Sequence, residues 1–380
     1  EGLIKIRICR IEMRSFDEIF EDKTKYGTKI KTSEYKEIGK YAIIDQGQEE
    51  IAGYTDLEKG VFEDVPAIIF GDHTRVIKYV RDPFFLGADG VKILKCKELN
   101  VNYKYLYYAL KNAKIPNTGY NRHFKWLKQI QIEYPSIDKQ EKIVKILDKV
   151  VMVIEDRRKE IQELDKLIKA RFVEMFGDPV HNPYGWNKTE LKELADLKIG
   201  PFGSLLHKED YIEGGHALVN PSHIVDGRII IDSKLTVSED KYEELSAYHL
   251  KVGDVVMGRR GEMGRCAVVE EEGLLCGTGS LLIRPKGKVT ADYIQKIISY
   301  PTFKKTIEDM AVGQTMPNLN VPIVSGFRII TPPIEVQNSY YDFVAQVNKS
   351  KVVYQIIINK LTFLQKICYN NYKEQYHIPG

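Results

Sequence analysis

The 380-residue sequence has few of the features that mark secreted, membrane or metal-binding proteins. Its five cysteines are scattered as Cys9, Cys96, Cys266, Cys276 and Cys368, and no two of them form a CxxC pair. An odd, dispersed set favours reduced thiols in a cytoplasmic protein over a disulfide framework or a zinc site. No apolar run approaches the roughly 18 to 20 residues that span a bilayer. The charged first residues are also unlike a signal peptide. We therefore expect a cytoplasmic protein that does not contact membranes.

Motifs for catalysis are also scarce. The eight histidines show no HExxH or other paired metal spacing, and no Walker-type phosphate loop is present. The stretch Asn182-Pro183-Tyr184 resembles the Asn/Asp-Pro-Pro-Tyr/Phe motif of amino-methyltransferases but lacks the second proline. No glycine-rich loop after a strand precedes it to hold S-adenosylmethionine, so a simple turn is favoured. We expect no catalytic residue, no metal and no cofactor bound by this chain.

The sequence carries little excess charge of either sign. Its formal net charge is +3, which excludes a strongly basic field over the whole molecule. Any surface that binds nucleic acid would have to be local. The hydrophobic fraction of 43% and the charged fraction of 29% are ordinary for globular proteins, and the length suggests two or more domains.

What the sequence does contain is an internal repeat. The stretches EYPSIDKQEKIVKILDKV and ITPPIEVQNSYYDFVAQV align at an offset of 197 residues, which places Pro135 on Pro332 and Gln140 on Gln337. Upstream, YLYYALKN matches YIQKIISY at an offset of 188, as insertions in loops would produce. IIFGDHTRV likewise matches VVMGRRGEM. Each half therefore indicates a domain of mixed strands and helices followed by a long helix.

The two long helices have a coiled-coil pattern. From Ile143 to Met175 apolar residues recur at alternating spacings of four and three, interrupted by Arg157 and Arg171. No glycine or proline lies between Ser136 and Phe176, so about 40 residues would form a rod of roughly 60 Å. The second helix repeats the pattern. We expect the helices to pair antiparallel with a globular domain at either end. The alternative is that each helix packs only on its own domain.

These patterns predict an α+β protein built from two pseudo-repeated α/β domains, each followed by a long helix, with the two helices pairing as an antiparallel coiled coil. The predicted segments are a first domain over residues 1–134, a first long helix and linker over 135–178, a second domain over 179–332 and a second long helix over 333–377.

The duplicated start of the long helices and the junction MFGDPVHNPYGW resemble the DNA specificity subunit of type I restriction–modification systems. Pro-Ser/Pro-Ile-Asp/Glu-x-Gln occurs at each helix start. The resemblance covers essentially the whole chain. It implies two target-recognition domains that read the two halves of a split double-stranded DNA site, with the paired helices setting the gap. It also implies two methyltransferase (modification) subunits, which carry S-adenosylmethionine, and restriction motor-nuclease subunits as partners.

Two other classes remain open. The chain could be a standalone DNA methyltransferase or a fragment of a fused restriction enzyme, which binding of S-adenosylmethionine by the isolated chain would support. It could also be a structural coiled-coil adaptor, which the absence of any DNA footprint in the full complex would favour.

Candidate DNA-reading residues are the cationic and amide side chains on predicted loops, because these groups hydrogen-bond base edges and phosphates. For the arginine-rich loop the alternative is a solvated hairpin with phosphate contacts only, and for the segments before the long helices it is a polar helix cap. The candidates are Arg259, Arg260 and Arg265 in one loop of the second half, His73, Thr74, Arg75 and Lys78 in its counterpart, Arg122, His123 and Lys125 together with Gln314, Asn318 and Asn320 before the long helices, and Ser204 and Asn220 elsewhere in the second half.

Overall fold

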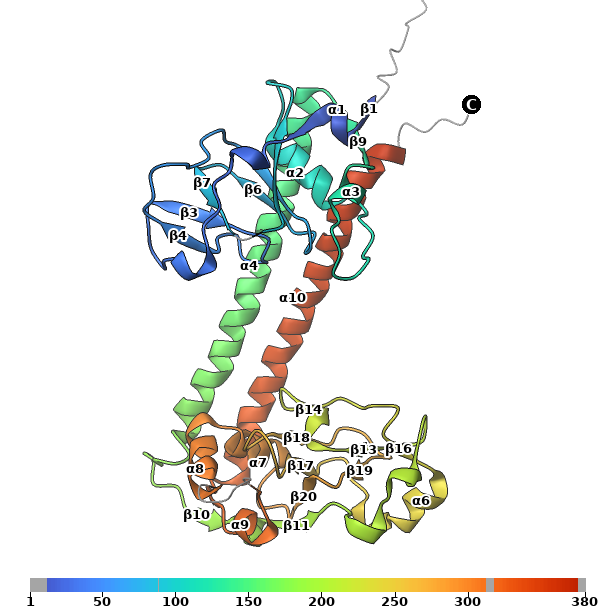
Figure 1. Cartoon of the computed structure of the whole chain (residues 1–380). Helices are drawn as coiled ribbons and strands as arrows, with labels where there is room; N and C mark the ends of the chain where they lie inside the picture. Colours follow the sequence, from blue (N-terminus) through green and yellow to red (C-terminus); the bar gives the residue numbers. More distant parts are fainter. Residues whose placement is uncertain (1–11, 88, 312–317, 375–380) are drawn as a thin grey trace, which may run out of the picture. The chain divides into compact units, whose positions relative to one another are not determined.

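The computed structural model describes residues 12–87, 89–311 and 318–374, which divide into two compact units (Figure 1). One unit contains the described residues up to Glu160 together with those from Val353 onward, and the other runs from Ile161 to Val352. The helices α4 (Ile137–Phe176) and α10 (Ile334–Glu374) each contribute one segment to either unit. No helix within the described ranges is long and apolar enough to cross a membrane.

Each unit contains a four-stranded antiparallel sheet with the same strand order. In the first unit the order is β2-β8-β5-β6, and in the second it is β11-β20-β17-β18. Each domain also contains one parallel strand pair, β3-β7 or β13-β19. The repeat predicted from the sequence is therefore confirmed in the topology. The strand bounds are β2 Phe20–Asp22, β3 Tyr41–Ile44, β5 Ala67–Gly71, β6 Ile77–Val80, β7 Phe84–Leu86, β8 Val91–Cys96, β11 Ala195–Ile199, β13 His216–Val219, β17 Val255–Gly258, β18 Cys266–Val268, β19 Leu275–Cys276 and β20 Ser280–Pro285.

The first and last strands of each domain form a two-stranded antiparallel ribbon. In the first domain β1 (Glu12–Ser15) pairs with β9 (Gln131–Tyr134). In the second, β10 (Lys188–Glu190) pairs with β21 (Arg328–Ile330). The described part of each domain therefore begins and ends at hydrogen-bonded neighbouring strands.

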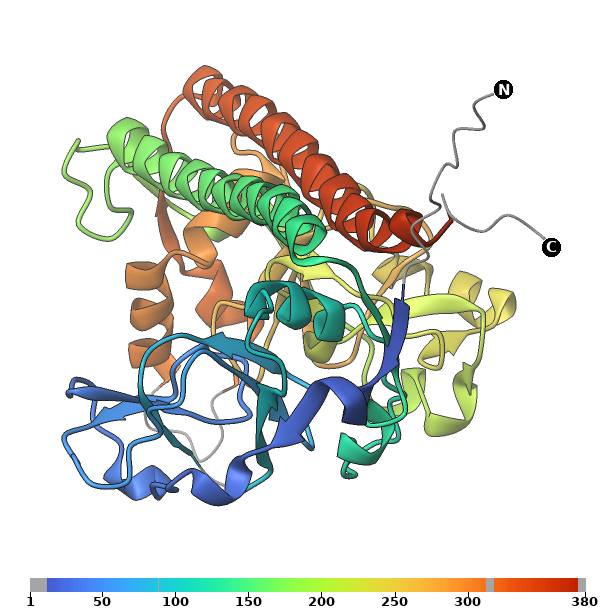
Figure 2. The ribbon, with the colours of Figure 1, turned by 90° about the horizontal axis from the view of Figure 1, so that it is seen from above.

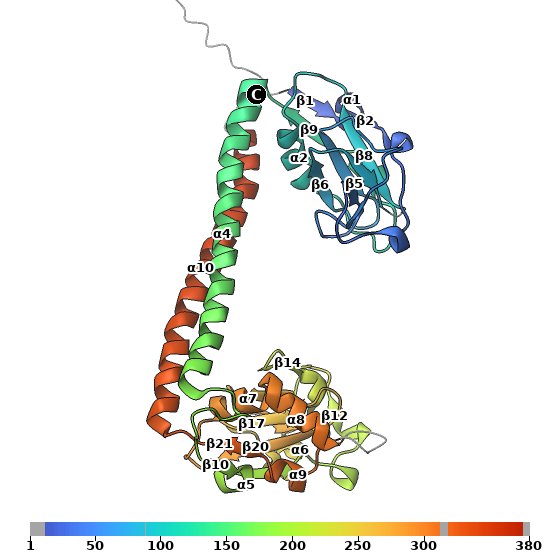
Figure 3. The same cartoon turned by 90° about the vertical axis from the view of Figure 1, so that its left-hand side faces the viewer.

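A short helix covers each sheet, and a polar residue caps its start. The Asn102 side chain accepts hydrogen bonds from two backbone amides at the start of α2 (Tyr103–Lys111). The Thr290 hydroxyl accepts one from Tyr293 at the start of α7 (Ala291–Ile298). Both caps satisfy amide groups that the helix itself leaves unpaired. Figure 3 shows α2 beside β5 and β6, where its buried face completes the core of the first domain.

A buried glutamine ties each long helix to the cap of that short helix. The Gln140 side chain accepts a hydrogen bond from the Asn102 backbone amide at 2.9 Å and donates to the carbonyl of the proline five residues earlier at 2.9 Å. Gln337 does the same with the Thr290 amide at 3.1 Å and with its own preceding proline at 2.9 Å. Both glutamines are at most 1% exposed. The aligned Pro and Gln residues thus serve one structural purpose in both halves.

In the second unit the two long helices pack against each other. Rings of Phe172 and Phe176 on α4 lie 5.6 and 5.4 Å from the ring of Tyr340 on α10. Farther along, the Lys351 ammonium lies 2.5 Å from the Asp165 carboxylate. Residue numbers rise along one helix as they fall along the other, so the pairing is antiparallel, as predicted (Figure 2).

In the first unit Arg157, which interrupts the apolar pattern, also contributes to helix pairing. The Arg157 guanidinium of α4 lies 5.4 Å from the centre of the Tyr354 ring of α10, a cation–π contact. The start of α4 also packs on its own domain, because Ile143, Val144 and Leu147 belong to the core formed with α2 and the sheet. The helices therefore pack on each other, and α4 packs on its own domain as well.

Candidate nucleic-acid interface

In the first domain the loop after β5 meets the segment before α3 (Phe124–Leu127). The Asp72 carbonyl accepts the His123 backbone amide at 2.8 Å, and the Asp72 carboxylate accepts the Phe124 amide at 2.7 Å. The His123 ring is 0% exposed, and its Nδ1 lies 3.0 Å from the Asp72 carbonyl oxygen. Two of the segments predicted to read DNA therefore come together, joined through Asp72.

The outer side of this junction presents an aromatic stack and cations. The His73 ring stacks on the Tyr120 ring at 4.9 Å, and Tyr120 is 88% exposed. Arg122 and Lys125 are exposed in the same segment. Thr74 is also exposed, although its hydroxyl donates a 2.6 Å hydrogen bond to a backbone carbonyl. These side chains can reach a ligand from solvent.

Three candidates in this domain form contacts inside the protein instead. Lys78 is 2% exposed and donates to the Glu49 carbonyl at 2.5 Å. His123 is buried beneath the junction described above. Lys78 and His123 must therefore be removed from the predicted DNA-binding set, because neither side chain is accessible. The Arg75 side chain is half-buried and donates a hydrogen bond to the Ile115 carbonyl at 3.3 Å. Its backbone adopts the left-handed conformation, with φ of 62°.

In the second domain the loop between β17 and β18 meets the segment before α9 (Val321–Ser325). The Arg259 carbonyl accepts the Leu319 amide at 3.0 Å, and the Arg259 Nε donates to the Leu319 carbonyl at 2.8 Å. Burial, together with the neighbouring charge of Arg260, lowers the pKa of Arg259. Arg259 therefore braces the junction, whereas Arg260 is exposed and has no hydrogen bond or ion pair among the described residues.

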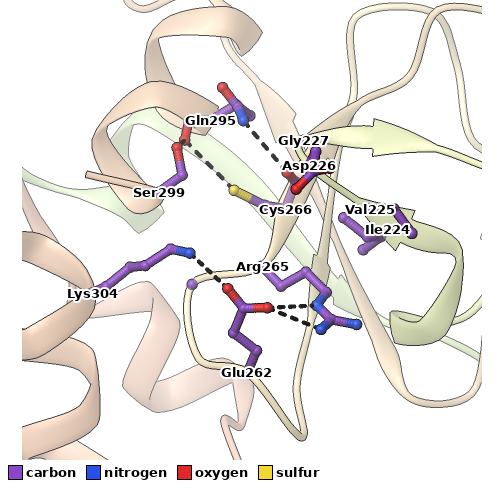
Figure 4. A pocket seen from close by; sticks show the side chains of 11 residues that line it. Ile224, Val225, Asp226, Gly227, Glu262, Arg265, Cys266, Gln295, Ser299 and Lys304 are labelled. Atoms are coloured by element: carbon purple, nitrogen blue, oxygen red, sulfur yellow. Dashed lines mark hydrogen bonds and ion pairs between the residues drawn. The ribbon is translucent and has the colours of Figure 1, made fainter. Parts of the chain in front are cut away.

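Arg265 ends the same loop in a small ion-pair network (Figure 4). Its Nε and Nη2 donate to Glu262 Oε2 at 3.3 and 2.9 Å, and its Nη1 donates to the Pro221 carbonyl at 3.1 Å. Lys304 of α8 (Pro301–Ala311) binds the other carboxylate oxygen of Glu262 at 2.9 Å. Hydrogen bonds from Lys304 and Arg265 lower the pKa of Glu262. Glu262 and Lys304 were not among the sequence candidates, although the three-residue spacing of Glu262 and Arg265 offered a signal.

The amide candidates of the second domain are placed unequally. Asn320 is exposed, and its side chain caps α9 by accepting the Ile323 amide at 3.0 Å. The Asn318 Oδ1 is buried and has no hydrogen-bond partner in the part of the chain that the structure describes. Asn220 is half-buried and precedes Pro221, which contacts Arg265. Ser204 is exposed in the turn Gly203–Leu205. Gln314 lies outside the described residues.

The chemistry offered by these junctions is hydrogen bonding and positive charge. Across residues 12–87, 89–311 and 318–374 no three His, Cys, Asp or Glu side chains are grouped so that they could hold a metal ion. Arginine and amide side chains on loops are suited to base edges, and exposed lysine and arginine are suited to phosphates. The two domains present different side chains at equivalent places.

The model of the type I restriction modification DNA specificity domain matches the sequence twice, over residues 10–166 and 183–362. Two curated relatives from Methanocaldococcus jannaschii are similar over part of the chain. The putative type I restriction enzyme MjaX specificity subunit is 27% identical over 41% of this chain and 37% of its own length. The MjaIX specificity subunit is 23% identical over 57% of this chain and 54% of its own length. The chain thus spans about half, or less, of the length of these curated relatives.

Solved structures share the fold over nearly the whole chain. The S subunit of a type I restriction–modification system from M. genitalium has a TM-score of 0.55 and 18% identity, covering 95% of this chain and 96% of that one. A chain from a structural study of complex assembly and conformational transition of the type I R-M system has a TM-score of 0.59 and 16% identity, and the match covers 94% of this chain and 96% of that one. At these identities the likeness shows the fold alone.

Proposed function

Because the chain belongs to the family of type I restriction modification DNA specificity domains, we propose that it is a sequence-recognition subunit for double-stranded DNA. Each domain reads one half of a bipartite site, and the paired helices set the spacer. The observation that carries the proposal is the repeated junction, which has one backbone pattern and two sets of side chains. Asp72, His73 and Thr74 occupy the loop in one domain, and Arg259 and Arg260 occupy it in the other.

The proposed subunit is not itself catalytic. It binds two methyltransferase subunits, which hold S-adenosylmethionine and modify adenine, and it joins restriction motor-nuclease subunits to the same DNA site. The family match supports this assignment, and the small net charge of +3 fits a protein whose DNA affinity depends on its partners. The proposed contacts are the exposed Thr74, Arg122, Lys125, Arg260 and Asn320 and the half-buried His73, Arg265, Asn318 and Asn220.

The test is methylation by a complex of this chain with its cognate methyltransferase subunits, followed by sequencing of the modified positions. We expect one split motif with a constant spacer. Replacing Arg265 by Ala should affect recognition of one half of the motif, whereas Lys166→Ala on an exposed face of α4 should leave the motif unchanged. A continuous motif, or no motif, would contradict the proposal. Binding of S-adenosylmethionine by the isolated chain would instead support a methyltransferase.

A further inference from the structure

The network around Arg265 leaves one particular pair of donors available. A guanidinium carries five N–H groups. In Arg265 the Nε hydrogen and one Nη2 hydrogen face Glu262, and one Nη1 hydrogen faces the Pro221 carbonyl. One hydrogen therefore remains on each terminal nitrogen. Two remaining donors, one on each terminal nitrogen, can pair with the O6 and N7 acceptors of guanine, the commonest specific contact of arginine in the major groove.

The orientation of this guanidinium is restrained through Lys304 of α8. Lys304 holds the Glu262 carboxylate from α8, so Glu262 cannot turn away without losing that ion pair. Gly264 lets the Lys304 stem pass, because a Cβ at this position would lie 2.7 Å from Lys304 Cγ and the glycine has φ of 75°. A residue that must read a base gains from such restraint, since less side-chain freedom is lost on binding.

The site also has room beside it. A cavity of about 320 Å³ adjoins Arg265 and is lined by the turn at Asp226 and Gly227, by Gln295 of α7 and by Glu262 and Lys304 (Figure 4). The Arg265 side chain is 33% exposed, so its remaining donors are not sealed inside the protein.

The charge of Arg265 is partly offset within the network. Glu262 pairs with both Arg265 and Lys304, so the three side chains carry a net charge of +1 and the guanidinium alone attracts a phosphate less strongly than an unpaired arginine does. A guanine edge is neutral, and its contact with arginine depends on the geometry of the donors rather than on excess charge. Arg260 differs, because it is exposed and no acidic partner among the described residues binds it, which suits a phosphate.

We propose that Arg265 reads a guanine in the half-site of the second domain, and that Glu262 and Lys304 are positioning residues that hold its guanidinium for that contact. The inference rests on the proposed function of the chain. It adds a base identity and separates the roles of the three arginines: Arg259 braces the loop, Arg260 contacts phosphate and Arg265 contacts the base.

The experiment measures affinity of the complete complex with its methyltransferase subunits for DNA duplexes in which each position of the second half-site is varied. Arg265→Lys should lower the preference for guanine at one position by about tenfold or more, because lysine cannot form the paired contact. Glu262→Gln and Lys304→Gln should lower the same preference several-fold while guanidinium charge is retained. None of the three should change recognition of the first half-site, which serves as an internal control for folding.

Arg260→Gln is the matched comparison. It should weaken binding to all sequences alike and reduce the slope of log affinity against log salt by about one. If Arg265→Lys or Arg265→Gln behaves in that uniform way, or if Glu262→Gln and Lys304→Gln leave guanine preference unchanged, the inference is overturned. A wild-type complex with no split motif would instead overturn the proposed function, so the two failures are distinguishable.

Discussion

At the scale of single residues, His216 is held in a stack of rings with both of its nitrogens facing acceptors. Its Nδ1 lies 3.1 Å from the Gly273 carbonyl and its Nε2 lies 2.9 Å from the Glu239 carboxylate. Its ring lies 3.8 Å from that of Tyr242, which stacks on His249 at 3.7 Å. Only the imidazolium form can donate to both acceptors, and that form also gains from the aromatic face.

This geometry predicts a pH-dependent contribution to the stability of the second domain. The hydrogen bond with Glu239 raises the pKa of His216 above its usual value of about 6.5. The stabilisation should therefore be fully present below about pH 6.5 and be lost as pH rises through the raised pKa. NMR titration of the His216 ring should give this raised pKa. Thermal unfolding across the same range should lose that pH dependence in His216→Gln.

Replacing the exposed His207 by Gln controls for loss of a histidine that lies outside the stack. If His216→Gln and the unchanged protein show the same dependence of thermal unfolding on pH, the stack does not hold a charged imidazole.

Single residues also show what sequence patterns cannot decide. Lys78 and His123 have the side-chain chemistry of DNA contacts, yet both are buried because distant residues supply their partners. Lys78 donates to Glu49, which lies 29 positions away, and the His123 ring meets the carbonyl of Asp72, 51 positions away. Residue type and loop position suggested candidates, but accessibility depends on contacts between segments that no local pattern records.

At the scale of elements, the start of each long helix is a junction built around one amide side chain. The Gln140 side chain accepts a hydrogen bond from the backbone amide of Asn102, which would otherwise lack this partner beside the cap of α2. It also donates to the backbone at the start of its own helix. Loss of a buried side chain that satisfies two backbone groups leaves both unpaired, which is costlier than the loss of an exposed hydrogen bond.

Replacing Gln140 by Ala should therefore destabilise the first domain by about 1–3 kcal/mol. Gln162→Ala is the matched control, because Gln162 is exposed on the same helix and alanine favours helix formation there. Hydrogen exchange is the suitable measurement, since a chain of two units need not unfold in one step. The amides around the start of α2 should exchange faster in Gln140→Ala alone. Equal acceleration in both variants would show that the junction contributes nothing specific.

The elements were the most predictable part of the structure. The aligned Pro and Gln residues and the alternating apolar spacing predicted both long helices and their antiparallel pairing. The partner of each glutamine was not predictable, because Asn102 and Thr290 differ in type and align at the separate offset of 188. Likewise, Arg157 and Arg171 interrupt the apolar pattern, and only the structure shows that each lies over an aromatic ring of the opposite helix.

At the scale of the whole molecule, α4 and α10 are the elements that continue through both units. In α4 the boundary falls after Glu160, and in α10 it falls after Val352. Neither helix contains a glycine or proline within its bounds, so the backbone hydrogen bonding can run on through the boundary. Under the proposed function, the length of these helices is what determines the spacer of the DNA motif.

Inserting four residues into each helix, after Lys159 in α4 and after Val353 in α10, should lengthen the spacer. Four helical residues add about 6 Å, which corresponds to about two base pairs at 3.4 Å each. The bases read in either half should stay the same, because the insertions lie outside both sheets. The measurement is sequencing of methylated sites. Four substitutions at the same places, without insertion, provide the control, and an unchanged spacer would contradict the role of the helices.

The ribbons β1–β9 and β10–β21 have a consequence for how such a molecule can change (Figure 3). Because Glu12 pairs with Tyr134 and Lys188 pairs with Ile330, the two ends of each domain lie together whatever is folded between them. Each domain is therefore joined to the rest of the chain at one place, the two-stranded ribbon. Exchange of the segment between the strands of a ribbon would replace all the loops of that domain at once, even with a domain of another length, while the long helices keep their sequence. Under the proposed function, new DNA specificities would then arise by exchange of whole domains as well as by point mutation.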